Sequence, residues 1–309
     1  MRVLFWGTPA FALPALFALG EEGHDVVGVV TQPDRPAGRG REVAHSAVKE
    51  AALPLGVPIL QPEHARGDHF LAEVRALQPE LSVVVAFGQI LRPEVLSAPV
   101  HGSINIHASL LPELRGAAPI QWAIARGHTV TGISIMQMEA GLDSGPVLLR
   151  VEEPILPDET ASELTARLAE IGAEALVETL ALLEGVGVVP EPQDHALATF
   201  APKVDRETAR LDWSRTARDV ALLMRALDEA PGAWSGLEGQ GAVKLFRPAS
   251  AEGSAAPGTV IAADRDGVTV ACGGGAVRVQ EVQPPGRRRM SAGEWVSGRG
   301  VQVGQRFGV

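Results

Sequence analysis

Cysteine and long apolar runs are scarce in this sequence, and each scarcity excludes a class of protein. The 309 residues contain one cysteine, Cys272, so the chain forms no internal disulfide, as is usual in a reducing compartment. No apolar stretch approaches the ~20 residues that a membrane-spanning helix needs. The apolar N-terminal stretch is not typical of a signal peptide, because Gly7 and two prolines interrupt it. We therefore expect a cytoplasmic protein without a membrane segment.

Several ligand-binding motifs are also absent. The first turn after an apolar run reads GTPAFALP, without the glycines that bring a dinucleotide's pyrophosphate to a helix N-terminus. The sequence contains no P-loop, and its His, Cys, Asp and Glu residues do not have the spacing of metal ligands. A dinucleotide, a P-loop nucleotide and a metal are therefore not expected.

The charge of the chain is uneven along its length. Apolar residues make up 46% of the chain, enough for sizeable cores, and the net charge of −10 argues against a general nucleic-acid binder. Counted from the sequence, however, residues 1–202 carry −13 and residues 203–309 carry +3. We therefore expect two parts with different roles.

The first part alternates strand-like and helix-like segments. Helical periodicity marks Ala10–Leu19, 67–77 and Thr160–Glu184. The expected strands are Val3–Trp6, Val26–Thr31, Val57–Ile59, Leu81–Ala86, Ser103–His107, Gly132–Gln137 and Val147–Val151. This alternation predicts an α/β domain over residues 1–185, with a Rossmann-like, mostly parallel sheet covered on both faces.

The second part has a different texture. Residues 186–205 are rich in proline and lack periodicity, which predicts a linker. Beyond it, one helix over Ala217–Leu227 precedes five short strands near 233–237, 242–246, 258–262, 267–271 and 276–282. Short strands at this spacing predict a small OB-like β-barrel domain over residues 206–309.

Chemistry-bearing residues concentrate in SINIHASLLPELRGAAPIQWAI, residues 103–124. Asn105 and His107 are two residues apart at the end of an expected strand, so both side chains face one side of the sheet. Asp143 follows the sixth strand in the glycine-bounded loop MEAGLDSG. Asn, His and Asp together suit acyl transfer, since Asn can donate to an oxyanion while His and Asp move a proton.

Structural roles explain the same three residues when spacing alone is considered. Asn105 could cap a turn, His107 could be a hydrogen-bonded core histidine, and Asp143 could form an Asx turn. No serine or cysteine has the neighbours of a covalent nucleophile. The reaction expected here is therefore direct attack by a nucleophile of the substrate.

The run Asn105–Pro112, followed by Arg115-Gly116 and Asp143, resembles the folate-dependent formyltransferase family. The resemblance implies that Asn105, His107 and Asp143 are the catalytic groups. It implies that 10-formyltetrahydrofolate is the formyl donor, and that no metal takes part. The segment implied to line the donor site consists of Ser109, Leu110, Leu111 and Pro112.

A second motif concerns the acceptor. The segment TQPDRPAGRGREVAHSAVKE (Thr31–Glu50) resembles the basic loop by which family members acting on methionyl-tRNA contact the acceptor arm of initiator tRNA. Arg35, Arg39 and Arg41 form a cationic arm that suits phosphate contacts. A solvated surface loop would have the same composition.

The resemblance also implies that the linker and the C-terminal barrel help to hold the tRNA. The first candidates, at the start of the C-terminal part, are Lys203 and Arg206, and further candidates are Lys244, Arg247 and Arg287, Arg288 and Arg289. Glu42, Ala108 and Glu113 depart from the family pattern. We expect a monomer whose partner is methionyl initiator tRNA.

Three rivals remain open at this point. A sugar-nucleotide formyltransferase shares the catalytic residues but lacks the arginine loop. A formyltetrahydrofolate hydrolase domain shares them and releases formate. A non-catalytic RNA-binding protein would have no need of all three catalytic residues.

Overall fold

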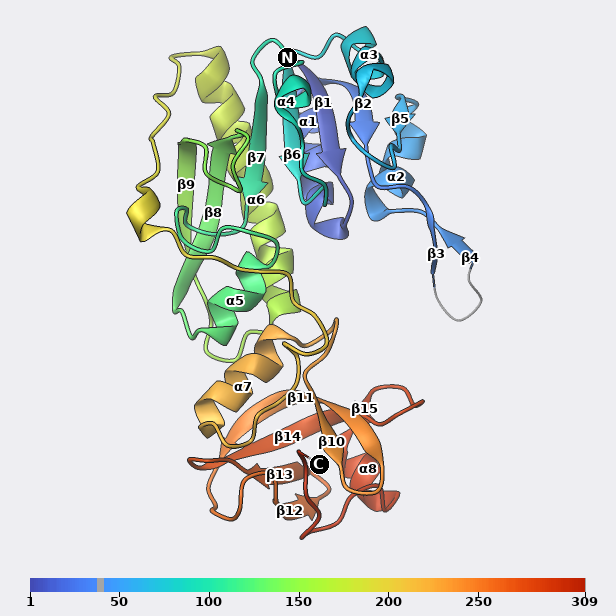
Figure 1. Cartoon of the computed structure of the whole chain (residues 1–309), viewed down its shortest axis with the longest axis vertical. Coiled ribbons are helices and arrows are strands. Elements are labelled where there is room, and N and C mark those ends of the chain that lie inside the picture. The colour runs from blue at the N-terminus through green and yellow to red at the C-terminus, as the bar shows by residue number, and fades with distance from the viewer. Residues whose placement is uncertain (38–41, 309) are drawn as a thin grey trace. The chain divides into compact units, whose positions relative to one another are not determined.

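Figure 1 shows the computed structural model, which describes residues 1–37 and 42–308. The chain divides into two compact units. The first unit comprises Met1–Pro119, Thr131–Pro154 and Thr165–Pro202, and the second comprises Ile120–Val130, Ile155–Leu164 and Lys203–Val309. Two internal segments that precede residue 203 therefore belong to the second unit.

A seven-stranded sheet organises the first unit, in the order β5-β2-β1-β6-β7-β8-β9. Its first five strands in this order are parallel neighbours, and β8 runs antiparallel to β7. The strands are β1 (Arg2–Gly7), β2 (Asp25–Val30), β5 (Ile59–Leu60), β6 (Leu81–Val85), β7 (Ser103–His107), β8 (Val130–Gln137) and β9 (Val147–Pro154). The expected α/β class with a mostly parallel sheet is confirmed.

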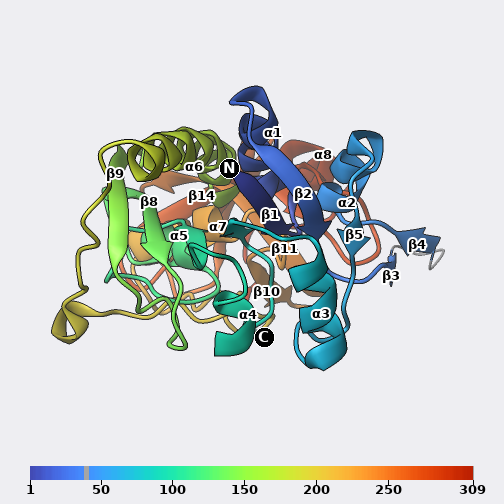
Figure 2. The same cartoon turned by 90° about the horizontal axis from the view of Figure 1, so that it is seen from above.

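Helices cover both faces of this sheet (Figure 2). Helices α1 (Leu13–Glu21) and α6 (Ala161–Glu184) lie on one face, and α3 (Asp68–Ala76) and α4 (Pro93–Leu96) lie on the other. Trp6 of β1 packs edge-on against Phe70 at 5.8 Å and Phe87 at 5.3 Å, measured between ring centroids. Burial on both faces explains why central strands such as β1 and β2 are nearly continuous apolar runs rather than alternating ones.

The third strand and several short elements differ from the sequence prediction. Val57–Ile59 was expected as a strand, but β5 begins at Ile59. Pro58 has no N–H to donate to a ladder, and only its carbonyl pairs with the sheet, accepting from Val29. The unpredicted elements are β3 (Arg35–Ala37), β4 (Glu42–Ala44), α2 (Ala47–Ala52), α4 and α5 (Pro119–Ala125) in the N-terminal half, and β15 (Met290–Ser291) and α8 (Ala292–Ser297) near the C-terminus.

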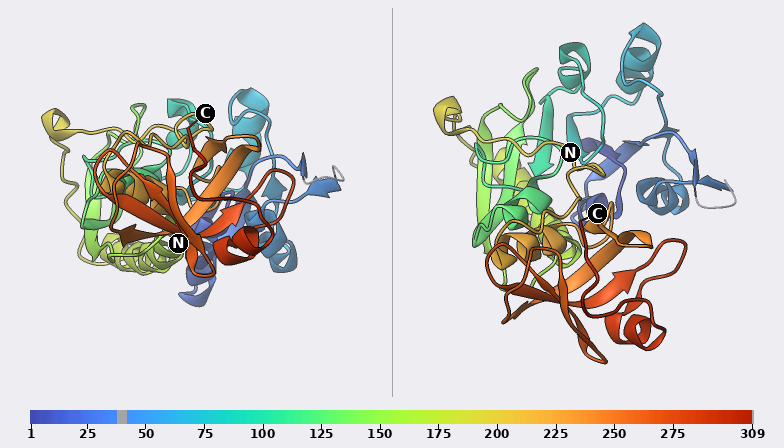
Figure 3. Two further views of the ribbon diagram at one scale, coloured as in Figure 1. Left: turned by 90° about the horizontal axis from the view of Figure 1, so that it is seen from below. Right: turned by 60° about the horizontal axis from the view of Figure 1, so that its bottom comes forward.

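The second unit contains an antiparallel sheet in the order β10-β11-β14-β13-β12, with β15 paired to β14. Figure 3 views its strands from two further directions. The strands are β10 (Trp234–Leu237), β11 (Gly241–Ala251), β12 (Val260–Asp264), β13 (Gly267–Ala271) and β14 (Ala276–Gln283), and helix α7 (Ala217–Ala226) packs on them. All five strands lie where the spacing predicts them.

The C-terminal segment joins the two edges of this sheet. Arg306 bridges to Thr259 beside β12, and Phe307 bridges to Leu237 of the opposite edge strand β10. The backbone N–H of Phe307 donates to the carbonyl oxygen of Gly258 at 2.8 Å, and that of Gly308 donates to Gly236 at 2.8 Å. A sheet whose edges are paired in this way is barrel-like and leaves few free edge groups.

Two features concern the described part of the chain as a whole. None of its helices has the length and apolar character required to cross a bilayer. It also has no group of three or more His, Cys, Asp and Glu side chains placed to hold a metal ion.

Candidate active site

The side chains of strand β7 alternate between a face that packs on a helix and a face that carries the predicted catalytic residues. Ile106 packs toward α6, where a Cβ added to Gly172 would lie 3.0 Å from its Cγ2 atom. Asn105 and His107 face the opposite side of the sheet, together with Ser103, whose hydroxyl donates to the Leu96 carbonyl of α4. Both side chains therefore stand on one face near the carboxyl end of a parallel strand, where α/β folds bind ligands.

Asn105 is nearly buried and has an unused amide. The residue is 9% exposed. Within residues 1–37 and 42–308 its side-chain amide makes no hydrogen bond. Buried amides usually find partners inside the protein. An amide left unpartnered beside His107 is available to donate to a ligand oxygen.

His107 is held by a backbone carbonyl. Its Nε2 atom lies 3.0 Å from the carbonyl oxygen of Leu114, and the ring is 6% exposed. A carbonyl only accepts, so Nε2 carries a proton and donates it. The Nδ1 atom faces the Oδ2 atom of Asp143 at 3.8 Å. In the neutral ring, Nδ1 is therefore the nitrogen that carries no proton and can take one up.

Asp143 is fixed by the loop that holds the histidine. Its Oδ2 atom accepts the backbone N–H of Gly116 at 2.8 Å. Asp143 has φ +45°, a left-handed conformation that is uncommon for residues other than glycine. Gly116 has φ +119°, and a Cβ at that position would lie 2.7 Å from the Ala201 carbonyl oxygen, so only glycine fits there. The predicted residues Asn105, His107 and Asp143 thus gather at one place.

The predicted donor-lining segment is mostly internal. Ser109 and Leu111 are each 1% exposed. The Ser109 hydroxyl donates to the Glu113 carbonyl at 2.6 Å, and the Leu111 N–H donates to Ser134 at 3.1 Å. Leu110 and Pro112 are half-buried. This segment shapes the sheet face beside His107, and only Leu110 and Pro112 present partly open side chains.

The predicted cationic residues are distributed as follows. Arg35 is exposed on β3, while Arg39 and Arg41 lie outside the described residues. Lys203 and Arg206 are exposed, and the Arg206 guanidinium lies 5.0 Å from the centre of the Trp234 ring.

Two of the further candidates pair with acidic groups. Arg247 lies 3.0 Å from Glu163, and Arg289 lies 2.6 Å from Glu281. These two side chains are partly neutralised within the chain.

Two residues that spacing did not single out lie next to the site. Gln193, 6% exposed, donates its amide to the carbonyl oxygens of Asp143 at 2.9 Å and Gly145 at 2.6 Å. The Thr199 hydroxyl accepts the N–H of Leu114 at 2.9 Å. Both belong to a stretch without periodicity, so only their contacts across the fold reveal them.

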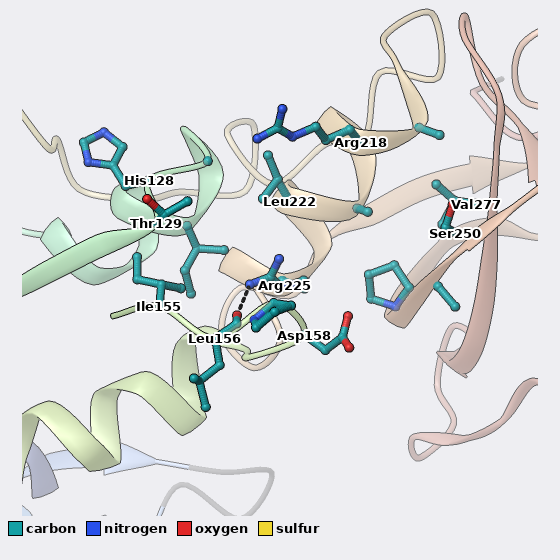
Figure 4. A pocket seen from close by; sticks show the side chains of 17 residues that line it. His128, Thr129, Ile155, Leu156, Asp158, Arg218, Leu222, Arg225, Ser250 and Val277 are labelled. Carbon is teal, nitrogen blue, oxygen red and sulfur yellow. Dashed lines mark hydrogen bonds between the residues drawn. The ribbon is translucent and has the colours of Figure 1, made fainter. Parts of the chain in front are cut away.

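A separate hollow of about 500 Å³ lies within the second unit (Figure 4). Its walls include Ile155, Leu156 and Leu222, and none of the predicted catalytic residues lines it. Arg225 donates to the Leu156 and Glu159 carbonyl oxygens at 3.1 and 2.9 Å. Its guanidinium is thereby used in joining α7 to the 155–164 segment.

Comparison with known proteins identifies the family of the chain. Residues 1–180 match the model of the family described as formyl transferase, and residues 203–300 match that of the formyl transferase C-terminal domain. The fold and the site therefore define a formyl transferase.

Curated relatives of similar length identify the family more specifically. The chain is 46% identical over 311 residues to a methionyl-tRNA formyltransferase of Sorangium cellulosum, covering 100% of both chains. It is 45% identical over 308 residues to one of Citrifermentans bemidjiense, covering 100% of this chain and 96% of the relative. The chain belongs to the methionyl-tRNA formyltransferase family.

Solved structures share the fold at low identity. HypX from Aquifex aeolicus in complex with tetrahydrofolic acid has a TM-score of 0.69 at 21% identity, covering 98% of this chain and 48% of that one. An N-formyltransferase from Helicobacter canadensis in complex with folinic acid and dTDP-3-aminofucose has a TM-score of 0.65 at 12% identity, covering 94% and 100%. These likenesses concern the fold alone.

Proposed function

We propose that this protein transfers a formyl group from 10-formyltetrahydrofolate to the amino group of methionyl initiator tRNA. The observation that carries the chemistry is the unpartnered Asn105 amide beside the His107–Asp143 pair. The observation that supports methionyl-tRNA as the acceptor is the similarity of the whole chain to the methionyl-tRNA formyltransferase family.

The residues present fit the formyl end of the donor. A formyl oxygen requires hydrogen-bond donors, and the Asn105 amide has no competing partner among the described residues. The half-buried side chains of Leu110 and Pro112, in the loop that follows β7, offer apolar surface. The donor supplies an activated one-carbon group on nitrogen; the protein supplies orientation and proton transfer.

The reaction is a direct acyl transfer. The unprotonated amine of the methionyl group attacks the formyl carbon, the new C–N bond forms, and the bond from that carbon to N10 breaks. Asn105 donates to the oxygen on which negative charge develops. His107 acts as a second donor or as the proton relay through Nδ1, since its Nε2–H is already donated to Leu114. Asp143 holds the ring and helps move the amine proton toward N10.

The acceptor is held by cationic residues at two places. Arg35, Arg39 and Arg41 contact phosphates of the tRNA, and Lys203 and Arg206 extend the contact at the start of the second unit. Residues 1–185 form the catalytic domain, 186–205 the linker, and 206–309 the tRNA-binding barrel. We propose a monomer acting in the cytoplasm, where translation initiates.

The first experiment measures transfer of labelled formyl from 10-formyltetrahydrofolate to methionyl initiator tRNA, with methionyl elongator tRNA in parallel. Formyl-methionine is expected on the initiator. The variant Asn105→Ala should lose on the order of 10²–10³-fold in kcat, the usual cost of removing one preorganised oxyanion donor.

Three results would contradict the proposal. Near wild-type turnover of Asn105→Ala would remove Asn105 from the chemistry. Formate release without transfer would favour a hydrolase, and the absence of donor consumption would favour a sugar-nucleotide enzyme or a non-catalytic protein. Circular dichroism of each variant checks that the fold is retained.

A further inference from the structure

We propose that the segment 193–201 belongs to the catalytic machinery, with Thr199 and Gln193 as positioning residues for His107 and Asp143. This inference rests on the proposed function. The segment begins fifty positions after Asp143 and more than eighty after His107, yet it contacts the loop that holds both of them.

Thr199 acts on the histidine through Leu114. The Leu114 carbonyl accepts from His107 Nε2 at 3.0 Å, and this bond fixes which ring nitrogen carries the proton. Leu114 has φ +57°, an uncommon conformation for a branched side chain that needs support from its neighbours. That support comes from Thr199, whose hydroxyl accepts the Leu114 N–H at 2.9 Å and whose carbonyl accepts the Arg115 N–H at 2.9 Å.

Further backbone bonds complete this support. The N–H of Ala201 donates to the Arg115 carbonyl at 2.7 Å, and the N–H of Ala118 donates to the Ala201 carbonyl at 3.2 Å. Gly116 lies between them and donates its own N–H to Asp143 at 2.8 Å. A shift of the 199–201 segment would therefore move the partners of both catalytic side chains.

Gln193 acts on the aspartate. Its amide nitrogen donates to the Asp143 and Gly145 carbonyl oxygens, and its Oε1 atom accepts from Arg115 at Nε, 3.1 Å, and Nη2, 2.6 Å. This one buried side chain joins the loop carrying Asp143 to the residue between Leu114 and Gly116. Gln193 thereby fixes the distance between the backbone that binds His107, at Leu114, and the loop that carries Asp143.

The first test uses Thr199→Val, which keeps the shape of the side chain and removes the acceptor. Because Thr199 is exposed, we expect the fold to be retained. Without the Thr199 hydroxyl, the Leu114 carbonyl that accepts from His107 is no longer held in place. The neutral His107 ring should then populate both tautomers. We expect kcat to fall about tenfold, a part of the ~10²–10⁴-fold that a positioned proton-transfer group contributes, while KM for both substrates stays unchanged.

Two readouts separate positioning from a structural effect. The imidazole signals of His107 in a nitrogen-15 NMR spectrum are assigned as those that are missing from the spectrum of His107→Gln. They should show a protonated Nε2 in the wild type and a mixture of the two tautomers in Thr199→Val. In the same variant, the pH at which kcat begins to fall should differ from that of the wild type. Thr199→Ser, which restores the hydroxyl, should return both to wild type.

The matched control is Thr216→Val. Thr216 is also exposed, and its hydroxyl also accepts a backbone N–H, that of Asp219 at 3.2 Å, at the start of α7 in the second unit. This control should lose a hydrogen bond of the same kind while the tautomer, kcat and pH profile stay at wild type.

Gln193→Glu tests the second contact separately. The glutamate keeps an acceptor for Arg115 and loses the two donors to the Asp143 loop, so kcat should fall and the pH profile should change with KM preserved. An unchanged tautomer and pH profile in both Thr199→Val and Gln193→Glu would overturn the positioning role. If Asn105→Ala is inactive in the same assay, the proposed function survives that result; if Asn105→Ala is active, the function itself fails.

Discussion

The imidazole of His107 has one nitrogen committed to the chain and one available for chemistry. The Nε2 proton is donated to a carbonyl, so the proton transfer proposed for this ring uses Nδ1, which faces Asp143. The neighbouring Asn105 needs no proton movement, because an amide donates in one protonation state only. In the proposed reaction, two side chains that are two residues apart on one strand thus have separate roles, charge stabilisation for Asn105 and proton transfer for His107.

The single thiol of the chain allows a prediction at the same scale. Cys272 is 5% exposed, and burial raises its pKa from 9.0 to about 11. Since the thiolate is the reactive form, the protonated thiol should not react with an aromatic disulfide reagent at pH 8 in the native protein. Labelling should appear only in denaturant, and its rate should report unfolding of the barrel.

Cys272→Ser serves as the control for that experiment. It should give no labelling under either condition, because Cys272 is the only cysteine of the sequence. Rapid labelling of the native wild-type protein would contradict the prediction.

Among the elements, the short hairpin β3–β4 is attached at its base by one carboxylate. Asp34 immediately precedes β3 and accepts from Lys49 of α2 and from Gln61. These hydrogen bonds, the one from Lys49 first, lower the pKa of Asp34 from 3.8 to about 2, and His45 at 3.0 Å adds to the effect. The stabilisation from this group is complete above pH ~4 and is lost as pH falls through about 2.

Asp34→Asn tests whether this anchor serves tRNA binding. The substitution removes the charge that Lys49 and His45 face, so the arginine-bearing hairpin should be held less firmly. KM for methionyl-tRNA should rise severalfold at pH 7, with KM for the folate donor unchanged. Steady-state kinetics with each substrate varied in turn measures both.

The comparison variant is Asp25→Asn. Asp25 forms an exposed ion pair with Arg2 at 3.0 Å in the same unit, and such pairs contribute little. It should leave both KM values at wild type. Equal KM values for tRNA in the wild type and Asp34→Asn would show that the anchor is not used for the acceptor.

The sequence predicted the long elements better than the short ones. Continuous apolar runs such as Val3–Trp6 match strands because burial on both faces requires them. Helices of four to seven residues, such as α4 and α5, carry too little periodicity to be distinguished from loops. The OB-like barrel was predictable from strand spacing, but its closure through Phe307 depends on pairing between distant residues.

Local spacing predicted where candidate site residues lie, while their catalytic roles were implied only by the resemblance to the formyltransferase family. Asn105 and His107 share a face because they are two apart on a strand, and a glycine-bounded loop pointed to Asp143. Gln193 and Thr199 have no such signal, since their partners lie about fifty to eighty-five positions away. Hydrogen bonds of this range are set by the tertiary fold.

At the scale of the whole molecule, the C-terminal segment is a large contributor to the second unit. Phe307 is 1% exposed and lies 5.6 Å from Trp213, between ring centroids. Phe307→Ala should lower the free energy of unfolding by about 3–5 kcal/mol, as for other buried aromatic side chains. Urea denaturation followed by tryptophan fluorescence measures the change.

An exposed aromatic residue provides the control. Phe17 of α1 is 47% exposed, so Phe17→Ala should change the unfolding midpoint by much less. A Phe307→Ala protein as stable as Phe17→Ala would mean that barrel closure does not depend on this ring.

The second unit contains segments from two separate regions of the sequence, and this limits how related proteins can exchange domains by recombination. Residues 120–130 and 155–164 precede the family's C-terminal domain in sequence, yet they belong to the second unit. Ser162 and Glu163 are bonded to Asp228 and Arg247 across that gap. A recombination event at residue 203 would therefore join a new barrel to inherited segments selected to fit the old one. Lineages that exchange only the C-terminal half would need compensating substitutions in those two segments.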